Sequence, residues 1–225
     1  MKISILTLFP EMFKGPFDSS IIKNATDKKK VSIEYVNIRD FGIGKHKTVD
    51  DTPYGGGQGM ILKVDVLEKA ISKTKNTAWK KQKVVLLTPE GKTFNQKIAR
   101  ELSKLKHLII VCGHYEGVDN RIEKFVDEKL SIGDFVVTGG EIPSMLIVDA
   151  VVRLKKGVLK KGVTENESFS PYLEYPQYTK PRKYKKLEVP KVLLSGHHGK
   201  IDDWRQKQSE KITKSLRPDI LIQKG

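Results

Sequence analysis

Residues 108–154 read LIIVCGHYEGVDNRIEKFVDEKLSIGDFVVTGGEIPSMLIVDAVVRL and contain two apolar runs, each of which ends in a turn that contains glycine. The first run, Leu108–Cys112, stops at Gly113–Gly117, and the second, Phe135–Val137, stops at residues 138–141. Apolar β-branched and aromatic residues favour strands, and glycine at a strand end lets the backbone approach a neighbour or a ligand closely. We therefore expect two strands that each lead into a tight turn.

A helix of small and apolar residues is expected next, from Ile142 to Leu154. It is apolar on nearly every side, which predicts burial on several sides. Its charged residues, Asp149 and Arg153, lie four positions apart and share one face, as an ordinary helical ion pair does. The pattern alone is typical of an α/β core, although two glycine turns also suit a backbone-lined pocket for a flat, polar, mostly uncharged ligand such as adenosine.

Strands and helices alternate along the chain before residue 108. The strands are expected at Lys2–Leu8, Val31–Ile38 and Lys83–Thr88, and the helices at Ser19–Ala25, Val64–Lys73 and Asn95–Lys104. This order predicts a mainly parallel sheet with helices on both faces. Because ligands bind at the carboxyl edge of such a sheet, Thr88–Pro89, Gly113–Gly117 and Ile132–Gly140 are predicted to surround one cavity.

The segment from Arg39 to Met60 is polar and dense in glycine, and it is too long for a simple connector. It lacks the Gly-Lys-Ser/Thr of a phosphate-binding loop, and Leu62 stands where a dinucleotide-binding motif requires its third glycine. On pattern alone it fits a flexible turn. It also contains side chains that are frequent in functional loops, namely Arg39, His46, Asp50 and Asp51.

The composition changes after Leu154. Residues 155–167 are charged and weakly periodic, which indicates a linker. Residues 172–186 interleave aromatic side chains with five basic residues, the combination that single-stranded or looped RNA requires. A short strand is expected at Val189–Leu194 and a helix from about Ile201 to Leu216. The pair His197-His198 fits a turn or a helix entry better than a metal site, because adjacent histidines point apart in an extended chain.

The chain has 225 residues and a net charge of +15, from 42 basic and 27 acidic residues. This charge points to a polyanionic partner such as nucleic acid, although a lysine-rich, solvated surface would give the same count. The single cysteine, Cys112, excludes an intrachain disulfide and a multi-cysteine zinc site. It fits a small buried side chain better than a thiol activated by His114. No signal peptide and no membrane-spanning stretch are expected.

Five motifs resemble one known family. They are PYGGGQGM (53–60), CGHYEG (112–117), SIGDFVVTGGEIP (131–143), LEYPQYTKP (173–181) and VPKVLLSGHHGKIDDWR (189–205). Together, and in this order over nearly the whole chain, they resemble the bacterial tRNA (guanine-N1)-methyltransferases of the TrmD family, which belong to the SPOUT class. The first strand is followed by Phe9-Pro10-Glu11, and not by the acidic-x-Gly-x-Gly turn of ordinary doubly wound methyltransferases.

The resemblance implies an α/β SPOUT domain at residues 1–160, with a mainly parallel sheet and a deep trefoil knot that binds the cofactor. A linker at residues 161–172 and a small, mostly helical tRNA-binding domain at residues 173–225 would follow. The resemblance also implies a cytoplasmic, obligate homodimer with no membrane association, in which each site is built from both chains.

The family further implies S-adenosylmethionine as cofactor and N1 of guanosine 37 as target, in tRNAs that also have G at position 36. Mg²⁺ dependence is a family expectation, and no metal-ligand cluster is predicted from the sequence. The residues that match the cofactor motifs are Leu87, Thr88, Pro89, Gly113, Tyr115, Glu116, Gly117, Ile132, Gly133, Asp134, Phe135, Val136, Val137, Gly139, Gly140 and Pro143. The positions expected to contact tRNA are Asp50, Gly57, Gly59, Ser195, His197 and Arg205.

Catalysis at guanine N1 requires removal of a proton, which a carboxylate can accept while an arginine stabilises the charge on O6. In the family the base is the aspartate of an Asp-Ser-Phe motif, which reads ESF at residues 167–169 here, and Arg153 matches the catalytic arginine. Glu167 is therefore assigned as the base. Two alternatives stay open: a linker or capping charge at Glu167 with Glu165 as the base, and a structural pair between Arg153 and Asp149.

Two further departures from the family pattern are Gln58, in place of a small residue or proline, and His114, where arginine is more usual. The second could weaken a contact near the cofactor loop. From the residues alone, a non-catalytic RNA-binding module and a SPOUT enzyme with a different RNA substrate remain alternatives.

Overall fold

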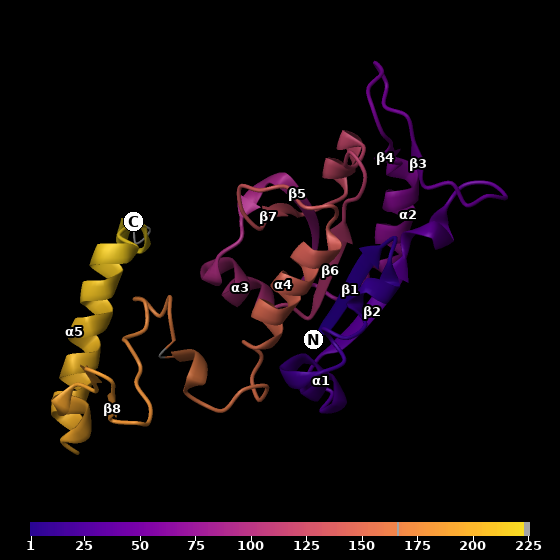
Figure 1. Ribbon diagram of the computed structural model, residues 1–225. Coiled ribbons are helices and arrows are strands. Elements are labelled where there is room, and N and C mark those ends of the chain that lie inside the picture. The colour runs from indigo at the N-terminus through magenta and orange to yellow at the C-terminus, as the bar shows by residue number, and fades with distance from the viewer. Residues whose placement is uncertain (166, 223–225) are drawn as a thin grey trace. The chain divides into compact units, whose positions relative to one another are not determined.

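The computed structural model describes residues 1–165 and 167–222. The chain divides into two compact units, unit 1 at Met1–Leu159 and unit 2 at Lys160–Gly225. Figure 1 shows the sheet of unit 1 and the long helix α5 of unit 2. No helix among the described residues is both long and apolar enough to span a membrane.

Unit 1 is built on a five-stranded sheet in the order β2-β1-β6-β5-β7. Its strands are β1 (Lys2–Thr7), β2 (Ser32–Asn37), β5 (Gln82–Thr93), β6 (His107–Cys112) and β7 (Glu128–Ser131). All neighbouring strands pair in parallel, so the predicted mainly parallel sheet is confirmed. Strand β6 is buried along its whole length because it lies between β1 and β5.

Each face of the sheet packs against its own helices. Alternate residues of β6 contribute to different cores, because successive strand side chains point to opposite faces. One face packs against α1 (Ser20–Asp27), α3 (Gln96–Ser103) and α4 (Glu141–Val152). The other packs against α2 (Val64–Thr74) and the 3₁₀ helices η2 (Ile38–Phe41) and η3 (Asn120–Lys124). Figure 1 shows α3 and α4 on the opposite side of the sheet from α2.

Helix α4 returns the chain from the edge strand β7 to the centre of the sheet, where it packs on β1 and β6. Val148 and Val151 are fully buried there. In contrast, Ile142 is 53% exposed and Leu146 is 48% exposed, and they lie four residues apart on one side of the helix. Helix α4 is therefore buried on several sides, as predicted, but one apolar stripe at Ile142 and Leu146 is exposed in the single chain.

The segment between β2 and α2 contains little regular structure. Two short strands, β3 (Asp50–Asp51) and β4 (Ile61–Leu62), pair antiparallel and close its base. The 3₁₀ helix η1 (Pro10–Phe13) follows β1, where proline starts the turn.

Two predicted strands are wrong. Residues Phe135–Val137 form a loop, and Val136 is 89% exposed; the strand of this region is β7, immediately before it. Gly133 has a φ of 145°, which ends strand geometry before the apolar run begins. Residues Val189–Leu194 contain the 3₁₀ helix η5 (Lys191–Leu194), which follows directly on Pro190. Proline there removes an N–H group that a strand would need.

Unit 2 is organised around α5 (His198–Leu216), with a short helix α6 (Asp219–Ile222) after it. The unit also contains η4 (Val163–Glu165) and a hairpin of β8 (Lys183–Tyr184) and β9 (Leu187–Glu188). The hydroxyl of Thr213, buried in α5, accepts a hydrogen bond of 2.8 Å from the backbone N–H of Leu173. This bond fixes the segment before the hairpin against α5.

Candidate functional site

A cavity of about 280 Å³ opens at the carboxyl edge of the sheet in unit 1. Its walls are residues 87–89 of β5, where the pairing of that strand with β7 shifts register, the turn after β6 at residues 113–118, and the end of β7 with the following loop at residues 130–140. The three segments predicted to surround one cavity do meet here, but Thr88 and Pro89 lie within β5, which continues to Thr93, and not in a turn after the strand. The arrangement follows from parallel strands that end at one edge.

Every residue assigned to cofactor binding from the sequence lines this cavity except Asp134. The lining residues among them are Leu87, Thr88, Pro89, Gly113, Tyr115, Glu116, Gly117, Ile132, Gly133, Phe135, Val136, Val137, Gly139, Gly140 and Pro143. The lining residues that the sequence assignment missed are His114, Val118, Leu130, Ser131 and Thr138. Leu130 and Ser131 end β7, so placing that strand correctly would have found them.

Backbone contacts hold two walls of the cavity together. The N–H of Gly140 donates a 2.8 Å hydrogen bond to the carbonyl oxygen of Gly113. His114 and Gly139 form an isolated antiparallel bridge beside this bond. A Cβ on Gly140 would lie 2.6 Å from Cα of Cys112, closer than real Cβ atoms approach. Glycine is therefore required at position 140 for close approach.

A buried carboxylate supports the same region. Glu141 is 1% exposed and is the first residue of α4, where the helix dipole favours negative charge. Its Oε1 accepts a 2.6 Å hydrogen bond from the hydroxyl of Thr7 at the end of β1. Its Oε2 lies 3.8 Å from Nδ1 of His114. Glu141 thus connects the central strand β1 to the turn that lines the cavity.

The glycine-rich loop at residues 53–60 lies against the cavity wall. The N–H of Glu116 donates a 3.0 Å hydrogen bond to the carbonyl oxygen of Met60. A Cβ on Gly59 would lie 2.5 Å from Cγ of Glu116, so glycine permits this contact. Gly57 is exposed with a φ of 135°, and Asp50 lies in β3 at the base of the loop. Gly59, an expected tRNA contact, therefore packs directly on Glu116, an expected cofactor residue.

Cys112 sits under the cavity and is 1% exposed. Burial, with the nearby Glu141 carboxylate adding to it, raises the pKa of the Cys112 thiol well above its usual value. A neutral, buried thiol is a poor nucleophile, which agrees with the interpretation of Cys112 as a core residue. Within the described part of the chain, no group of three or more His, Cys, Asp or Glu side chains could hold a metal ion.

Unit 2 has its own cavity of about 610 Å³, and Glu167 lines it with Tyr172, Glu174 and Arg205. The guanidinium of Arg205 lies 5.0 Å from the centre of the Tyr175 ring, a cation–π arrangement. Its Nη1 also lies 3.3 Å from Oδ1 of Asp202. The assigned base and an assigned tRNA contact therefore line one cavity that also has aromatic walls.

The remaining expected tRNA contacts lie at the start of α5. His197 is the residue before the helix, and the hydroxyl of Ser195 accepts a 3.2 Å hydrogen bond from its N–H. Both side chains are exposed. His197 and His198 occupy the helix entry, as predicted. Arg153 lies in unit 1, directly after α4, and its N–H donates a 3.2 Å hydrogen bond to the carbonyl oxygen of Asp149.

The family described as tRNA (Guanine-1)-methyltransferase TrmD matches residues 1–223. The chain belongs to the TrmD family. It is 55% identical over 229 residues to the tRNA (guanine-N(1)-)-methyltransferase of Carboxydothermus hydrogenoformans, covering 100% of this chain and 89% of that protein. The protein of the same name from Dictyoglomus turgidum is 54% identical, covering 98% of this chain and 90% of the relative. The one from Metamycoplasma arthritidis is 52% identical, covering 100% and 97%.

Both units contain motifs by which the sequence resembled the TrmD family. Two of these motifs, CGHYEG and SIGDFVVTGGEIP, form walls of the unit 1 cavity, and PYGGGQGM forms the loop packed against it. The departure from the TrmD pattern at position 114 lies inside the cavity wall, where His114 packs between Phe9 and Tyr115 at ring-centre distances of 4.9 and 4.8 Å. Arg153 and Glu167 belong to different units, so their joint role stays a prediction.

Proposed function

We propose that this chain transfers a methyl group from S-adenosylmethionine to N1 of guanosine 37 in tRNA. The observation that supports this most is the cavity whose walls are the two TrmD-family motifs after β6 and β7. The relatives named above are called tRNA (guanine-N(1)-)-methyltransferases, and they match this chain from end to end. The target at position 37, next to G36, comes from the family resemblance.

The cavity residues fit S-adenosylmethionine. Leu87, Ile132 and Pro143 offer apolar surface for a flat purine, and the glycine turns expose backbone polar groups for its edge. The carboxylate of Glu116 in the lining suits the positive charge of the methionine part. When bound, the cofactor supplies an electrophilic methyl group on its sulfonium. The protein then has to position the purine, remove a proton and stabilise charge.

Glu167 would accept the N1 proton of guanine, and the guanidinium of Arg153 would stabilise the negative charge that develops on O6. Glu167 replaces the family's aspartate and is one methylene longer, so its backbone would lie slightly farther from the base. Glu165 is the competing base, and it lies in the 3₁₀ helix η4 two residues earlier.

Contacts to tRNA would come from both units. Asp50, Gly57 and Gly59 present the loop that packs on the cavity wall. Ser195 and His197 are exposed at the start of α5, where backbone N–H groups favour phosphate. Arg205, stacked on Tyr175, offers the cation and aromatic pair that unpaired bases use.

We also infer the finer architecture of the family. The chain would pass through residues 132–140 as part of a deep trefoil knot, which agrees with the return from edge strand β7 to the central strands. It would act as a homodimer in the cytoplasm, and the exposed stripe of Ile142 and Leu146 supplies an apolar surface for the second copy. Mg²⁺ would assist as a family expectation, without a resident cluster of protein ligands among the described residues.

Methyl transfer onto tRNA transcripts tests this function. The enzyme, S-adenosylmethionine and a transcript with G36 and G37 should give a primer-extension arrest at position 37, because N1-methylation blocks Watson–Crick pairing. A transcript with A36 should react much more slowly. An arrest at another position would indicate a different RNA substrate. Cofactor binding by calorimetry without any methylated RNA product would favour another acceptor.

A further inference from the structure

The strongest unassigned feature of unit 1 is a depression of about 790 Å³ at the amino-terminal edge of the sheet. Its lining includes Lys2, Lys29, Lys104, Lys106 and Lys155, together with the ring of Trp79. Lys2 begins β1 and Lys106 directly precedes β6, so these side chains lie at the opposite ends of the strands from the cofactor cavity. The depression is therefore separate from the site described above.

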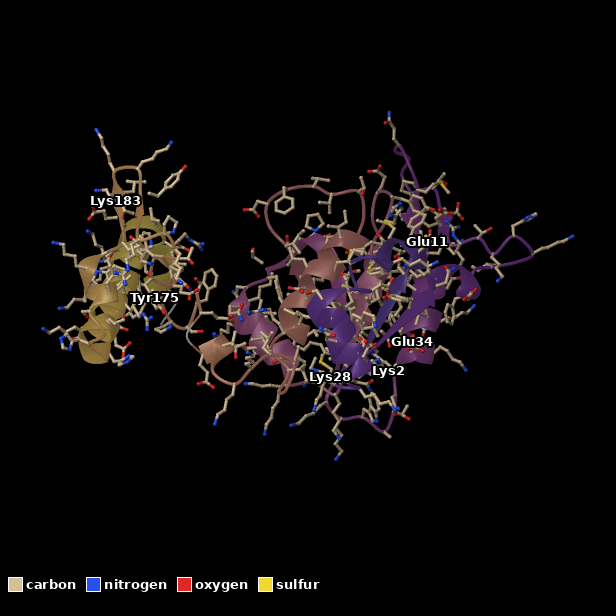
Figure 2. All side chains as sticks on the ribbon, turned by 60° about the horizontal axis from the view of Figure 1, so that its bottom comes forward. Lys2, Glu11, Lys28, Glu34, Tyr175 and Lys183 are labelled. Atoms are coloured by element: carbon tan, nitrogen blue, oxygen red, sulfur yellow. The ribbon has the colours of Figure 1, made fainter. Side chains whose placement is uncertain are left out.

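Positive charge in this depression is poorly balanced. The Nζ of Lys2 lies 2.8 Å from a carboxylate oxygen of Glu34. Figure 2 shows these two side chains together, away from Glu11 beyond the other end of β1. Across the residues that the structure describes, no carboxylate pairs with Lys29, Lys104, Lys106 or Lys155. Four lysines thus line one hollow without a counter-ion.

Helix termini explain only part of this cluster. Lys104 is the residue after α3, and Lys155 donates a 2.6 Å hydrogen bond to the carbonyl oxygen of Ser103, the last residue of that helix. Cations at a helix C-terminus are ordinary, so these two lysines have a structural role. Lys29 directly follows Lys28, the C-cap residue of α1, and its N–H donates a 2.8 Å hydrogen bond to the carbonyl oxygen of Thr26, so it also lies at a helix C-terminus. Lys106 lines the same hollow but lies at no helix end, and the helix termini do not account for it. Burial also lowers the pKa of Lys155, because desolvation disfavours its charged form. A bound anion would stabilise that charged form.

The chemistry of the hollow matches phosphodiester groups. Ammonium groups bind phosphates as point charges without reading a base, and one aromatic ring among several lysines is too few for a base-stacking track. Strand β6 has six residues, so the two edges of the sheet lie roughly 20 Å apart at about 3.3 Å per residue. A helical arm of tRNA is longer than that, and one molecule can therefore reach both edges.

We propose that this depression is a second tRNA contact, which binds backbone phosphates of the helical arms outside the anticodon loop. The inference rests on the proposed tRNA substrate. The depression would be a binding surface on unit 1 that does not distinguish tRNA sequences and raises the affinity for every tRNA equally. Its electrostatic origin makes the contribution strongly dependent on salt.

The double variant Lys104→Gln/Lys106→Gln tests the proposal by tRNA binding over a range of salt. Each lost phosphate contact lowers the slope of log affinity against log salt by roughly one, so the slope should fall by about two. At about 50 mM salt the variant should bind roughly tenfold more weakly, and the difference should shrink toward about 200 mM. The effect should be equal for tRNAs with G36 and with A36, because phosphates carry no sequence information.

The matched control is Lys69→Gln/Lys73→Gln, which removes the same charge from exposed positions on α2 outside the depression. It should keep the wild-type slope within about half a unit. A slope unchanged in Lys104→Gln/Lys106→Gln, or lowered equally in the control, would overturn the proposal. Binding is measured without methyl transfer, so this result is independent of position 37. If the wild-type protein produces no primer-extension arrest at position 37, that result would count against the proposed function alone.

Discussion

In the proposed mechanism the residue at position 167 holds a carboxylate within reach of a purine proton, and glutamate replaces the family's aspartate there. Glu167→Gln keeps the size and polarity of the side chain but removes the proton acceptor. We expect single-turnover methyl transfer to fall by about 10² to 10⁴, with tRNA affinity nearly unchanged, because general base catalysis contributes on that order. Rapid-quench measurement of methylated tRNA checks the rate.

Glu165→Gln is the matched control for that change, since it removes the same charge two residues away. It should keep the wild-type rate. If Glu165→Gln instead causes the loss and Glu167→Gln does not, the base is Glu165 and the assignment of Glu167 is wrong.

Gly140 is a residue whose lack of a side chain fixes the shape of the cavity. In Gly140→Ala, the new Cβ would lie 2.6 Å from Cα of Cys112 and 2.9 Å from N of Gly113. The two walls have to separate, which should lower stability by about 1–3 kcal/mol and weaken S-adenosylmethionine binding at least about tenfold. Thermal unfolding and calorimetry measure the two effects.

Gly199 provides the comparison for Gly140, because a Cβ there meets no atom within 4 Å. Gly199→Ala lies in the first turn of α5 and should be neutral or stabilising by up to about 1 kcal/mol. Wild-type cofactor affinity in Gly140→Ala would mean that the contact between Gly140 and Cys112 does not shape the cavity.

At the scale of elements, strands β1, β2 and β6 meet near their amino ends in a polar cluster, in which Ser4 and His107 are buried and Glu34 is exposed. Nε2 of His107 lies 2.9 Å from the hydroxyl of Ser4, and that hydroxyl donates a 2.9 Å hydrogen bond to Glu34. Nε2 must then carry the hydrogen, and the buried Nδ1 has no partner among the described residues. Burial, with the Lys2 ammonium adding to it, lowers the pKa of His107 from 6.5 to about 4.

This shift predicts an acid-sensitive sheet. Between pH of about 6.5 and 4 the unfolded chain binds a proton at His107 that the folded chain does not, so stability falls as the pH falls through that window. The loss should reach up to about 3 kcal/mol. Urea unfolding at a series of pH values measures it. Because most carboxylates titrate lower, the part between about pH 5 and 6.5 should flatten in His107→Gln. An equal slope in that variant would contradict the prediction.

Elements whose apolar side chains pack inside the chain were predictable from the sequence. Strand β6 and helix α2 show a clear period because each is buried against one or two neighbours. Residues 135–137 are equally apolar, and their composition predicted a strand. They instead form a loop that lines the cavity and is exposed, so here apolar composition does not mark a buried strand. The true strand β7 lies at the edge of the sheet and is short and polar, EKLS, which hides it from pattern reasoning.

The candidate site likewise has features that could be predicted from the sequence and features that could not. Residues 87–89 of β5 and the turn after β6 could be placed at one cavity because ligands bind at the carboxyl edge of a parallel sheet. The contribution of Glu141 could not, because a glutamate after two glycines looks like an exposed helix start, whereas Thr7 and His114 surround it in the fold. Contacts between residues more than a hundred positions apart depend on topology, which no local pattern contains.

At the scale of the whole molecule, the open stripe of α4 is the feature that a single chain leaves unexplained. Ile142 and Leu146 are about half exposed on a helix whose other face is fully buried. An apolar surface of this kind on a structured helix is typical of a protein interface. If a second copy covers it, an aspartate at position 146 would place an unpaired charge in that interface. The expected cost is about 3 kcal/mol, or roughly a hundredfold in the dissociation constant of the dimer.

Leu146→Asp should therefore shift the protein from dimer to monomer at micromolar concentration, as measured by sedimentation equilibrium. Methyl transfer should fall in parallel, because each site is proposed to use both chains. Ile43→Asp is the control, since Ile43 is 40% exposed and lies outside α4. It should remain dimeric and active. A Leu146→Asp protein that stays dimeric would place the interface elsewhere, and an active monomer would show that one chain completes the site by itself.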